Sequence, residues 1–424
     1  MCSIKSEIHA VRTMAPDSGI LTEQWLDETS RAEEFPRLYS VLSDHPRFGV
    51  AFAGVKAMGF RASHSQPPLL KHYYAEGVIQ SIIENNLRWA RGEAEQLQFQ
   101  FAYLMLPTPC NLKCRGCFMG KDKGRLPSHL SGPYYSEHEI HGILSFLVEH
   151  GAKAVAYAGG GELFAWNGAM DLVETIHSYG LRFVTFTNGT LLSRDDIGRL
   201  NDLGAVLMVS LRDTAEALHN AFVGCDAFRR TLSTIDAALE EGFHLDNRLA
   251  VEIPATKANT ERILSDFVPA MRALGIIPMV EEFIQISTSD DERTSCHDFA
   301  QARDFFERLS QIDARHGIVW QPEFGQRMMA QPKCRRPLYS FAVFPSGGVM
   351  DCPSHSVRYG NFKEQPLRDI FHSEGFRLAL RRFDICACSV FYTKHDEEIP
   401  EVLPEYLEAL RCSSSSCSPP VREA

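Results

Sequence analysis

The chain has 424 residues, enough for one large domain and a smaller one. Its formal net charge of -11 argues against a nucleic-acid partner, because neutralising phosphates requires clusters of basic side chains. No apolar run approaches the roughly 18 residues that span a bilayer, and residues 1–17 lack the apolar core of a signal peptide. We therefore expect a cytoplasmic protein with no membrane partner.

The elements predicted along the chain change character at residue 98. Residues 1–97 show helical patterns and no strand alternation, whereas 98–106 have the length and aromatic content of a buried strand, which Pro107 ends. Helices that stop at a glycine then alternate with further strands, expected at 154–158, 183–187, 205–211, 248–253 and 276–286. Such an alternation indicates parallel pairing with right-handed crossovers, and the chemistry gathers at the carboxyl ends of the strands.

Three cysteines lie directly after the first predicted strand: Cys110, Cys114 and Cys117. In a reducing compartment, clustered cysteines more often bind metal or do redox chemistry than form disulfides. Three thiolates on a [4Fe–4S] cluster leave one iron without a protein ligand, where a small molecule can bind. A zinc site completed by a distant His or Cys is the structural alternative.

This spacing after a strand resembles the radical S-adenosylmethionine (SAM) superfamily, over about residues 98–290. In that family SAM binds the open iron, and reduction of the cluster cleaves SAM to a 5′-deoxyadenosyl radical that takes hydrogen from the substrate. The resemblance implies a flavodoxin- or ferredoxin-like electron donor as a partner. Where the family commonly has an aromatic residue before the last cysteine, this chain has Gly116, and Phe118 follows as the expected neighbour of adenine.

The next strand ends resemble further SAM contacts of the family. Gly160-Gly161-Glu162 resembles the motif that meets the SAM amino group, since glycine lets the backbone approach a ligand and a carboxylate suits an ammonium. Thr187 and Asn188 resemble the ribose contact, with an Asn-Gly turn as the alternative. The other implied contacts are Ser210 and Arg212 for SAM hydroxyl and carboxylate groups, and Ile253 beside adenine. The structural alternatives are that Arg212 is an ordinary surface arginine after a strand and that Ile253 belongs to a core strand.

Two adjacent glutamates, Glu281 and Glu282, interrupt the last apolar strand. Strand alternation allows at most one of them to face the barrel cavity. A carboxylate there can bind a cationic group of a substrate. The alternative is an ion pair with a helix lysine or arginine, because buried carboxylates need partners.

A second group of cysteines follows the predicted barrel. A hairpin of 341–344 and 349–351 separates its first two members, and a helix separates the second from a close pair. This order resembles the twitch or SPASM extension, which binds an auxiliary [4Fe–4S] cluster. The implied ligands are Cys334, Cys352, Cys386 and Cys388. The family usually shows Cys-x-x-Cys where this chain has Cys-x-Cys, so three ligands, or a substitute from Cys412 or Cys417, remain alternatives, as does zinc.

The expected fold class is α/β, a partial (β/α)6 TIM-like barrel at 98–290 with a small α+β cluster-binding domain at 331–411. A helical region at 1–97 precedes the barrel, a helical linker at 291–330 joins the two domains, and the Ser-rich end at 412–424 is expected to be disordered.

The expected function is that of a radical SAM enzyme acting on a small polar metabolite, such as a sugar, aminocyclitol or nucleoside. The reaction would be an oxidation, a dehydration or an epimerisation. One alternative is a maturase of a ribosomally made peptide, although the helical pattern of residues 1–97 does not match the winged helix that such enzymes often carry. The other is an iron–sulfur electron carrier, which would have no use for an open iron.

Overall fold

The computed structural model describes residues 76–115, 117, 133–245, 248–283, 297, 299–315, 336–353 and 358–383. Several of the predictions lie outside these residues: those on 1–75 and 412–424, and those on Phe118, Cys334, Cys386 and Cys388.

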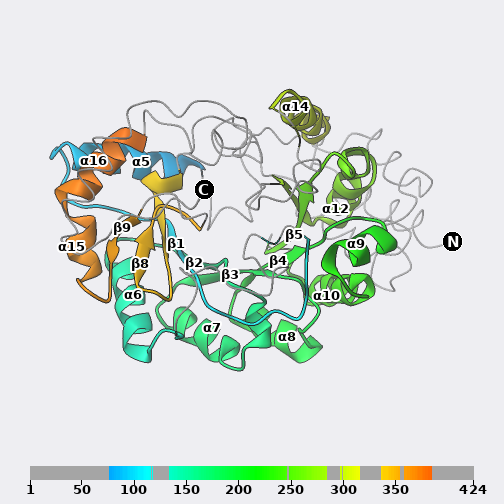
Figure 1. Ribbon diagram of the computed structural model, residues 1–424, viewed down its shortest axis with the longest axis horizontal. Coiled ribbons are helices and arrows are strands. Elements are labelled where there is room, and N and C mark those ends of the chain that lie inside the picture. Colours follow the sequence, from blue (N-terminus) through cyan, green and yellow to red (C-terminus); the bar gives the residue numbers. More distant parts are fainter. Residues whose placement is uncertain are drawn as a thin grey trace, which may run out of the picture.

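The described strands form one curved sheet in the order β6-β5-β4-β3-β2-β1-β7-β8-β9 (Figure 1). The first six run parallel, and each pairs with the next strand in the sequence. Their bounds are Phe101–Leu104 (β1), Ala154–Tyr157 (β2), Arg182–Thr187 (β3), Val206–Ser210 (β4), Leu249–Ala255 (β5) and Ile277–Glu282 (β6). The expected α/β class with a parallel, barrel-like sheet is therefore confirmed.

Helices cover the outer face of this sheet (Figure 1). They are α6 (Glu137–Glu149), α7 (Ala169–Ser178), α8 (Arg194–Asp202), α9 (Glu216–Val223), α10 (Phe228–Glu240), α11 (Thr260–Arg262), α12 (Val268–Leu274) and α14 (Phe299–Arg315). Short helical turns lie at Leu163–Ala165 (η5) and Ile263–Phe267 (η6, a π-helix). Capping boxes begin α6 at Ser136 and α8 at Ser193, so the starts of these two helices have a local cause in the sequence. None of the described helices is long and apolar enough to cross a membrane.

Two helices, α9 and α10, stand between β4 and β5, where the sequence pattern predicts one. Gly224 ends α9 because it takes a left-handed conformation with φ of 78°. The side-chain oxygen of Asn220 then accepts the main-chain N–H groups of Ala227 and Phe228, which begins α10. The break places α9 alone beside the loop that carries the three cysteines.

The C-terminal strands extend the same sheet. β7 (Ser340–Val343) runs parallel to β1, with Phe101 opposite Ser340. β8 (Gly348–Met350) and β9 (Arg358–Asn361) follow in antiparallel order. The predicted hairpin is present, and its first strand joins it to the parallel strands as one continuous sheet. After η8 (Arg336–Leu338) and these strands come α15 (Leu367–Phe371) and α16 (Glu374–Phe383).

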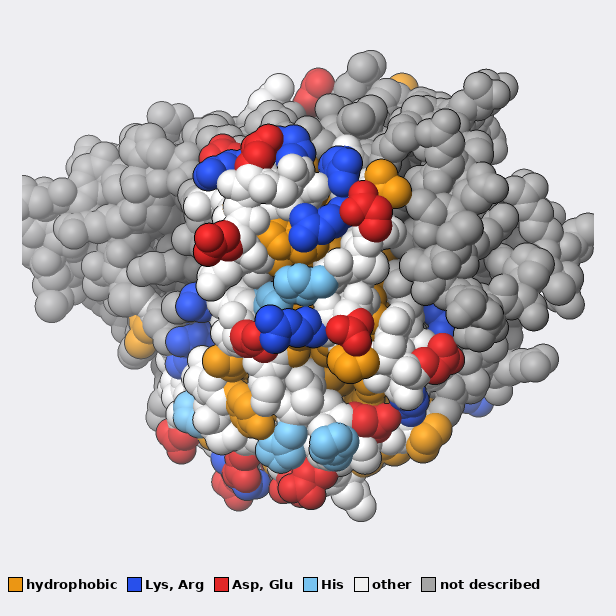
Figure 2. All heavy atoms as spheres, turned by 90° about the vertical axis from the view of Figure 1, so that its left-hand side faces the viewer, with side chains coloured by type: hydrophobic (Ala, Val, Ile, Leu, Met, Phe, Trp, Pro, Cys, Tyr) orange, Lys and Arg blue, Asp and Glu red, His pale blue; other side chains and the backbone are white. Residues whose placement is uncertain are grey.

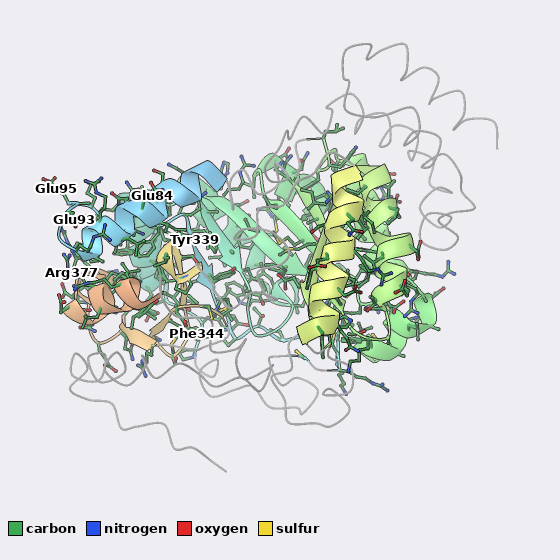
Figure 3. The ribbon with its side chains drawn as sticks, turned by 90° about the horizontal axis from the view of Figure 1, so that it is seen from above. Glu84, Glu93, Glu95, Tyr339, Phe344 and Arg377 are labelled. Atoms are coloured by element: carbon green, nitrogen blue, oxygen red, sulfur yellow. The ribbon has the colours of Figure 1, made fainter. Side chains whose placement is uncertain are left out.

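Helix α5 (Glu76–Ala90) packs against α16 and so joins the two ends of the described chain (Figure 3). The Arg377 guanidinium lies 3.9 Å from the centre of the Trp89 ring, and its Nη1 donates to the Trp89 carbonyl at 2.6 Å. Acidic, basic and histidine side chains alternate on the described part of this end of the molecule (Figure 2). The contact is therefore an apolar and cation–π packing beneath a mixed polar exterior.

Asn86 is a fully buried polar residue of α5. Its Nδ2 donates to the carbonyls of Gln98 at 2.7 Å and Leu338 at 2.8 Å, and its Oδ1 accepts the Gln98 N–H at 3.0 Å. One side chain thus holds together α5, the segment before β1 and the segment before β7.

Replacing Asn86 with alanine should lower the free energy of unfolding by roughly 3 kcal/mol, because one buried and two partly buried main-chain groups lose their partner. The matched control is Asn85→Ala. The side chain of Asn85 donates to the Gln96 carbonyl at 2.8 Å on the surface and to Asn86 Oδ1 at 3.3 Å, and its loss leaves the three main-chain bonds of Asn86 in place, so we expect a loss below about 1 kcal/mol. Urea unfolding of both variants measures the difference, and equal losses would contradict the bridging role of Asn86.

Candidate active site

The cysteine loop leaves the carboxyl end of β1 and is fixed by the end of α9. The N–H groups of Lys113 and Arg115 donate to the carbonyls of Val223 at 3.1 Å and Phe222 at 2.9 Å. Within the loop the Cys117 N–H donates to the Cys114 carbonyl at 3.3 Å. Main-chain bonds therefore set the path of the loop, and they leave its side chains available for other contacts.

The three thiols of the loop are all partly buried. Cys110 and Cys114 pack against a small apolar cluster of Leu112, Val223 and Ala227, and Cys117 packs against the main core. Burial raises the pKa of the Cys114 thiol to about 11, while the charge of Arg212 opposes this rise. A positive charge and three thiols thus share one half-buried environment.

The glycine loop after β2 lies directly against the segment that enters the cysteine loop. The N–H of Gly160 donates to the Leu106 carbonyl at 2.7 Å, and that of Glu162 donates to the Pro109 carbonyl at 2.9 Å. A Cβ on Gly161 would lie 2.3 Å from the carbonyl oxygens of Thr108 and Pro109. Only glycine fits this approach, which supplies a structural reason for part of the motif.

Glu162 is buried and joins the ends of β2 and β3. Its Oε1 accepts the Thr187 hydroxyl at 2.7 Å, and its Oε2 accepts the Asn188 N–H at 2.7 Å. Burial raises the pKa of this carboxyl to about 7, although the hydrogen bonds from Asn188 and Thr187 act in the opposite direction. The predicted motif residues at two strand ends are therefore in direct contact.

The side chain of Asn188 extends this network to the cysteine loop. Its Nδ2 donates to Asn111 Oδ1 at 3.0 Å, and its Oδ1 accepts the Thr190 hydroxyl at 2.6 Å. Asn111 in turn donates to the Thr190 hydroxyl at 2.7 Å. The residue that follows Cys110 is thus held to the end of β3 by side-chain amides and a hydroxyl.

Arg212, just beyond β4, lies among acidic groups and thiols. Its Nη1 is 3.3 Å from Glu252 Oε1 on β5. Burial acts to lower the pKa of Arg212, but the nearby Glu252 carboxylate, together with Cys114, Cys117 and Glu281, raises it. The register pairs Ser210 with Glu252 and Pro254 with Glu281, so these polar side chains share one face of the sheet.

Replacing Glu162 with glutamine should remove a pH dependence of stability. The pKa of this carboxyl is about 7 in the folded chain, above its ordinary value of 4.5, so the folded state binds the proton more tightly. The proton that Glu162 binds therefore contributes about 3 kcal/mol to the free energy of unfolding. This contribution is full below pH 4.5 and is lost as the pH rises through 7.

Urea unfolding of the chain without cofactors, between about pH 5 and pH 8, measures this dependence. The exposed Glu137→Gln is the control and should keep the wild-type slope. A wild-type slope in the Glu162 variant would contradict the assignment of the pH dependence to this buried carboxyl.

Some predicted residues stand apart from this network. Ile253 is fully buried and, by alternation, lies on the face of β5 opposite to Glu252, so its adenine contact stays a prediction. Glu281 shares the face of Glu252, while the side chain of Glu282 lies outside the described part. Of the auxiliary cysteines, Cys352 alone falls within the described residues, just after β8, and it is partly buried.

Sequence reasoning missed two residues of the site, Glu252 and His219, and it missed the packing of Cys225 beside the cysteine loop. Glu252 is a buried carboxylate in an apolar strand, which is a signal that was available. His219 accepts the main-chain N–H of Arg212 at 3.2 Å, and no motif marks it. Cys225, which looks isolated along the chain, packs against the same apolar cluster as Cys110 and Cys114.

The donor chemistry of the cysteine loop fits an iron–sulfur cluster. Its three partly exposed thiols lie on one loop, and cysteine thiolates are the ordinary ligands of such clusters. In the described part of the chain, no three His, Cys, Asp or Glu side chains are arranged to hold a metal ion. A cluster of four irons is larger than one ion and separates its thiolate ligands accordingly.

Two family models match the chain. The radical SAM superfamily model matches residues 107–254, and the model of the SPASM iron–sulfur cluster-binding domain matches residues 334–390. The first range includes the cysteine loop, the glycine loop and Arg212. The second begins at Cys334 and includes Cys386 and Cys388.

Two individual proteins are similar to parts of this chain. An AdoMet-dependent heme synthase of Methanosarcina barkeri is 26% identical over 299 residues, which are 64% of this chain and 82% of the relative. An uncharacterized protein of Methanocaldococcus jannaschii is 31% identical over 135 residues, 31% of this chain and 41% of that protein.

Solved structures share the fold. Streptococcus suis SuiB bound to the precursor peptide SuiA aligns with a TM-score of 0.52 and 16% identity, covering 75% of this chain and 77% of SuiB. Native anSMEcpe with bound AdoMet aligns with a TM-score of 0.50 and 12% identity, covering 74% of this chain and 100% of that one. The chain is therefore an enzyme that contains a radical SAM domain at residues 107–254 and a C-terminal SPASM iron–sulfur cluster-binding domain at residues 334–390.

Proposed function

We propose that this radical SAM enzyme takes a hydrogen atom from a small polar molecule that carries a cationic group. The observation that carries the proposal is the meeting of the cysteine loop with Arg212, Glu252 and Glu281 near the carboxyl edge of the sheet. When bound, the [4Fe–4S] cluster supplies the electron that cleaves SAM to a 5′-deoxyadenosyl radical, which abstracts the hydrogen.

The residues of the chain would hold and orient these groups. Cys110, Cys114 and Cys117 would hold the cluster by three irons and leave the fourth for SAM. The main chain at Gly160 and Gly161 lies against the entry to the cysteine loop, so the SAM amino group would meet this loop close to the open iron.

The other proposed contacts follow from the strand ends. Both oxygens of Glu162 accept bonds from Thr187 and Asn188, so Glu162 would fix these two residues toward the ribose. Ser210 and Arg212 remain the proposed contacts for the hydroxyl and carboxylate groups of SAM, and Phe118 and Ile253 those for adenine. An auxiliary cluster would be held by Cys334, Cys352, Cys386 and Cys388.

Two considerations favour a small-molecule substrate. The heme synthase that matches 299 residues of this chain makes, by its name, a small molecule. The structures with bound peptide resemble this chain in fold alone, at identities of 14% to 16%, so they lend little weight to a peptide substrate. Glu281 on the face of Glu252 is the proposed contact for a cationic substrate group, with Glu282 as the second candidate.

Radical formation with candidate substrates tests the proposal. The enzyme, reconstituted anaerobically with SAM and a reductant, is given pools of small polar metabolites or ribosomal peptides, and 5′-deoxyadenosine is measured above the uncoupled background. We expect stimulation by amine-bearing metabolites and a smaller stimulation in Glu281→Gln. Stimulation by peptides alone would overturn the substrate class and support a peptide maturase.

A further inference from the structure

We propose that His219 positions Arg212 beside the cysteine loop, an inference that rests on the proposed function. His219 lies on α9 and is 1% exposed, and its Nδ1 accepts the main-chain N–H of Arg212 at 3.2 Å. A ring nitrogen that accepts a hydrogen bond carries no proton, so the neutral ring has its proton on Nε2. Burial and the charge of Arg212 lower the pKa of His219 to about 4, which keeps the ring neutral.

The Nε2 side of the His219 ring indicates why a histidine occupies this position. Within the described residues Nε2 is buried and has no hydrogen-bond partner, and the ring packs edge-on against Phe228 with centroids 5.5 Å apart. A buried N–H without a partner costs free energy, which an apolar side chain of similar size would avoid. The benefit of a histidine at this position must therefore come from the bond that Nδ1 makes to Arg212.

The same helix holds the cysteine loop. The carbonyls of Phe222 and Val223, one turn after His219, accept the N–H groups of Arg115 and Lys113. The Phe222 ring also lies under Arg212, with its centre 5.9 Å from the guanidinium carbon. Helix α9, with eight residues, thus fixes both the loop that carries the thiols and the arginine that faces them.

The position of Arg212 matters because its charge acts on the thiols. Phe222 joins the two: its ring centre lies 5.9 Å from the guanidinium carbon, and its carbonyl accepts the N–H of Arg115, the residue after Cys114. A cation beside the thiolates stabilises the more negative, reduced form of a cluster and raises its midpoint potential. Losing the His219 bond frees the main chain of Arg212, so the charge is held less firmly near the loop.

The test uses four single variants and one double variant of the full-length enzyme with reconstituted clusters. His219→Leu removes the acceptor, and His219→Asn restores it, because the Asn carbonyl oxygen lies near the position of Nδ1. Arg212→Lys changes the charged group directly. His150→Leu, a buried histidine at the end of α6, is the matched control and should behave as the wild type.

Two quantities are measured for each variant: the dissociation constant of SAM and the midpoint potential of the cluster whose electron paramagnetic resonance signal changes when SAM is added. In His219→Leu we expect a more negative potential and roughly three- to tenfold weaker SAM binding. His219→Asn should recover both values. Combining His219→Leu with Arg212→Lys should add less than the two single effects together, because both act through one side chain.

A wild-type potential and a wild-type SAM affinity in His219→Leu would overturn the positioning role while leaving the proposed function intact. Equal shifts in His150→Leu would also overturn it, because any buried histidine would then have the effect. A wild-type enzyme that holds no SAM-responsive cluster would overturn the proposed function and this inference together.

Discussion

Replacing Cys110, Cys114 and Cys117 together with alanine should remove about four irons and abolish the formation of 5′-deoxyadenosine. Without these thiols the loop has no ligand for a cluster, and SAM has no open iron to bind. The iron that remains should be that of the SPASM domain. Iron analysis and product analysis of the reconstituted variant, both by comparison with the wild type, measure the two losses.

Cys225→Ala is the matched control for this variant. Cys225 packs against the same apolar cluster as Cys110 and Cys114, but it lies between α9 and α10 rather than on the loop. We therefore expect it to keep the iron content and the activity of the wild type. If Cys225→Ala lost as much iron as the triple variant, the ligand assignment would be wrong.

Gly161→Ala should be the most damaging single change outside the cysteines. The new Cβ would lie 2.3 Å from two main-chain oxygens, those of Thr108 and Pro109, and neither can move without displacing the start of the cysteine loop. A displacement of about 1 Å in such a site costs roughly a hundredfold in rate. The rate of 5′-deoxyadenosine formation at saturating SAM measures this loss.

Gly142→Ala controls for the glycine-to-alanine change itself. Gly142 lies on the exposed face of α6, and no heavy atom lies within 4 Å of a Cβ placed there. Because alanine favours a helix over glycine by about 1 kcal/mol, we expect unchanged activity and a slightly higher stability. Wild-type activity in Gly161→Ala would show that the close approach of the two loops is not needed for catalysis.

The parts of this structure that were predictable from the sequence depend on local patterns. The strand at 101–104 is apolar and aromatic, Ser136 and Ser193 begin helices through their own side chains, and the three cysteines share one short loop. The Gly-Gly-Glu segment and Thr187-Asn188 were also expected at strand ends. Their direct contact through Glu162 agrees with that expectation, while the SAM contacts assigned to them stay predictions.

What the sequence did not indicate depends on residues far apart in the chain. The pairing of Phe101 with Ser340 joins the C-terminal strands to the barrel sheet, and no local pattern marks it. The hydrogen bond from Asn86 to the Leu338 carbonyl also joins residues far apart in the chain, and no local pattern marks it. Glu252 and Arg212 meet because β4 and β5 are neighbours in one register, and a one-residue shift would turn Glu252 to the other face.

The central claim is that the cysteine loop supports reductive cleavage of SAM. The direct test is to reconstitute the wild-type enzyme anaerobically, confirm its iron content, add SAM and a low-potential reductant, and measure 5′-deoxyadenosine and methionine. We predict that both products form together and that neither forms when the reductant is omitted. A fully loaded enzyme that releases neither product would contradict the account.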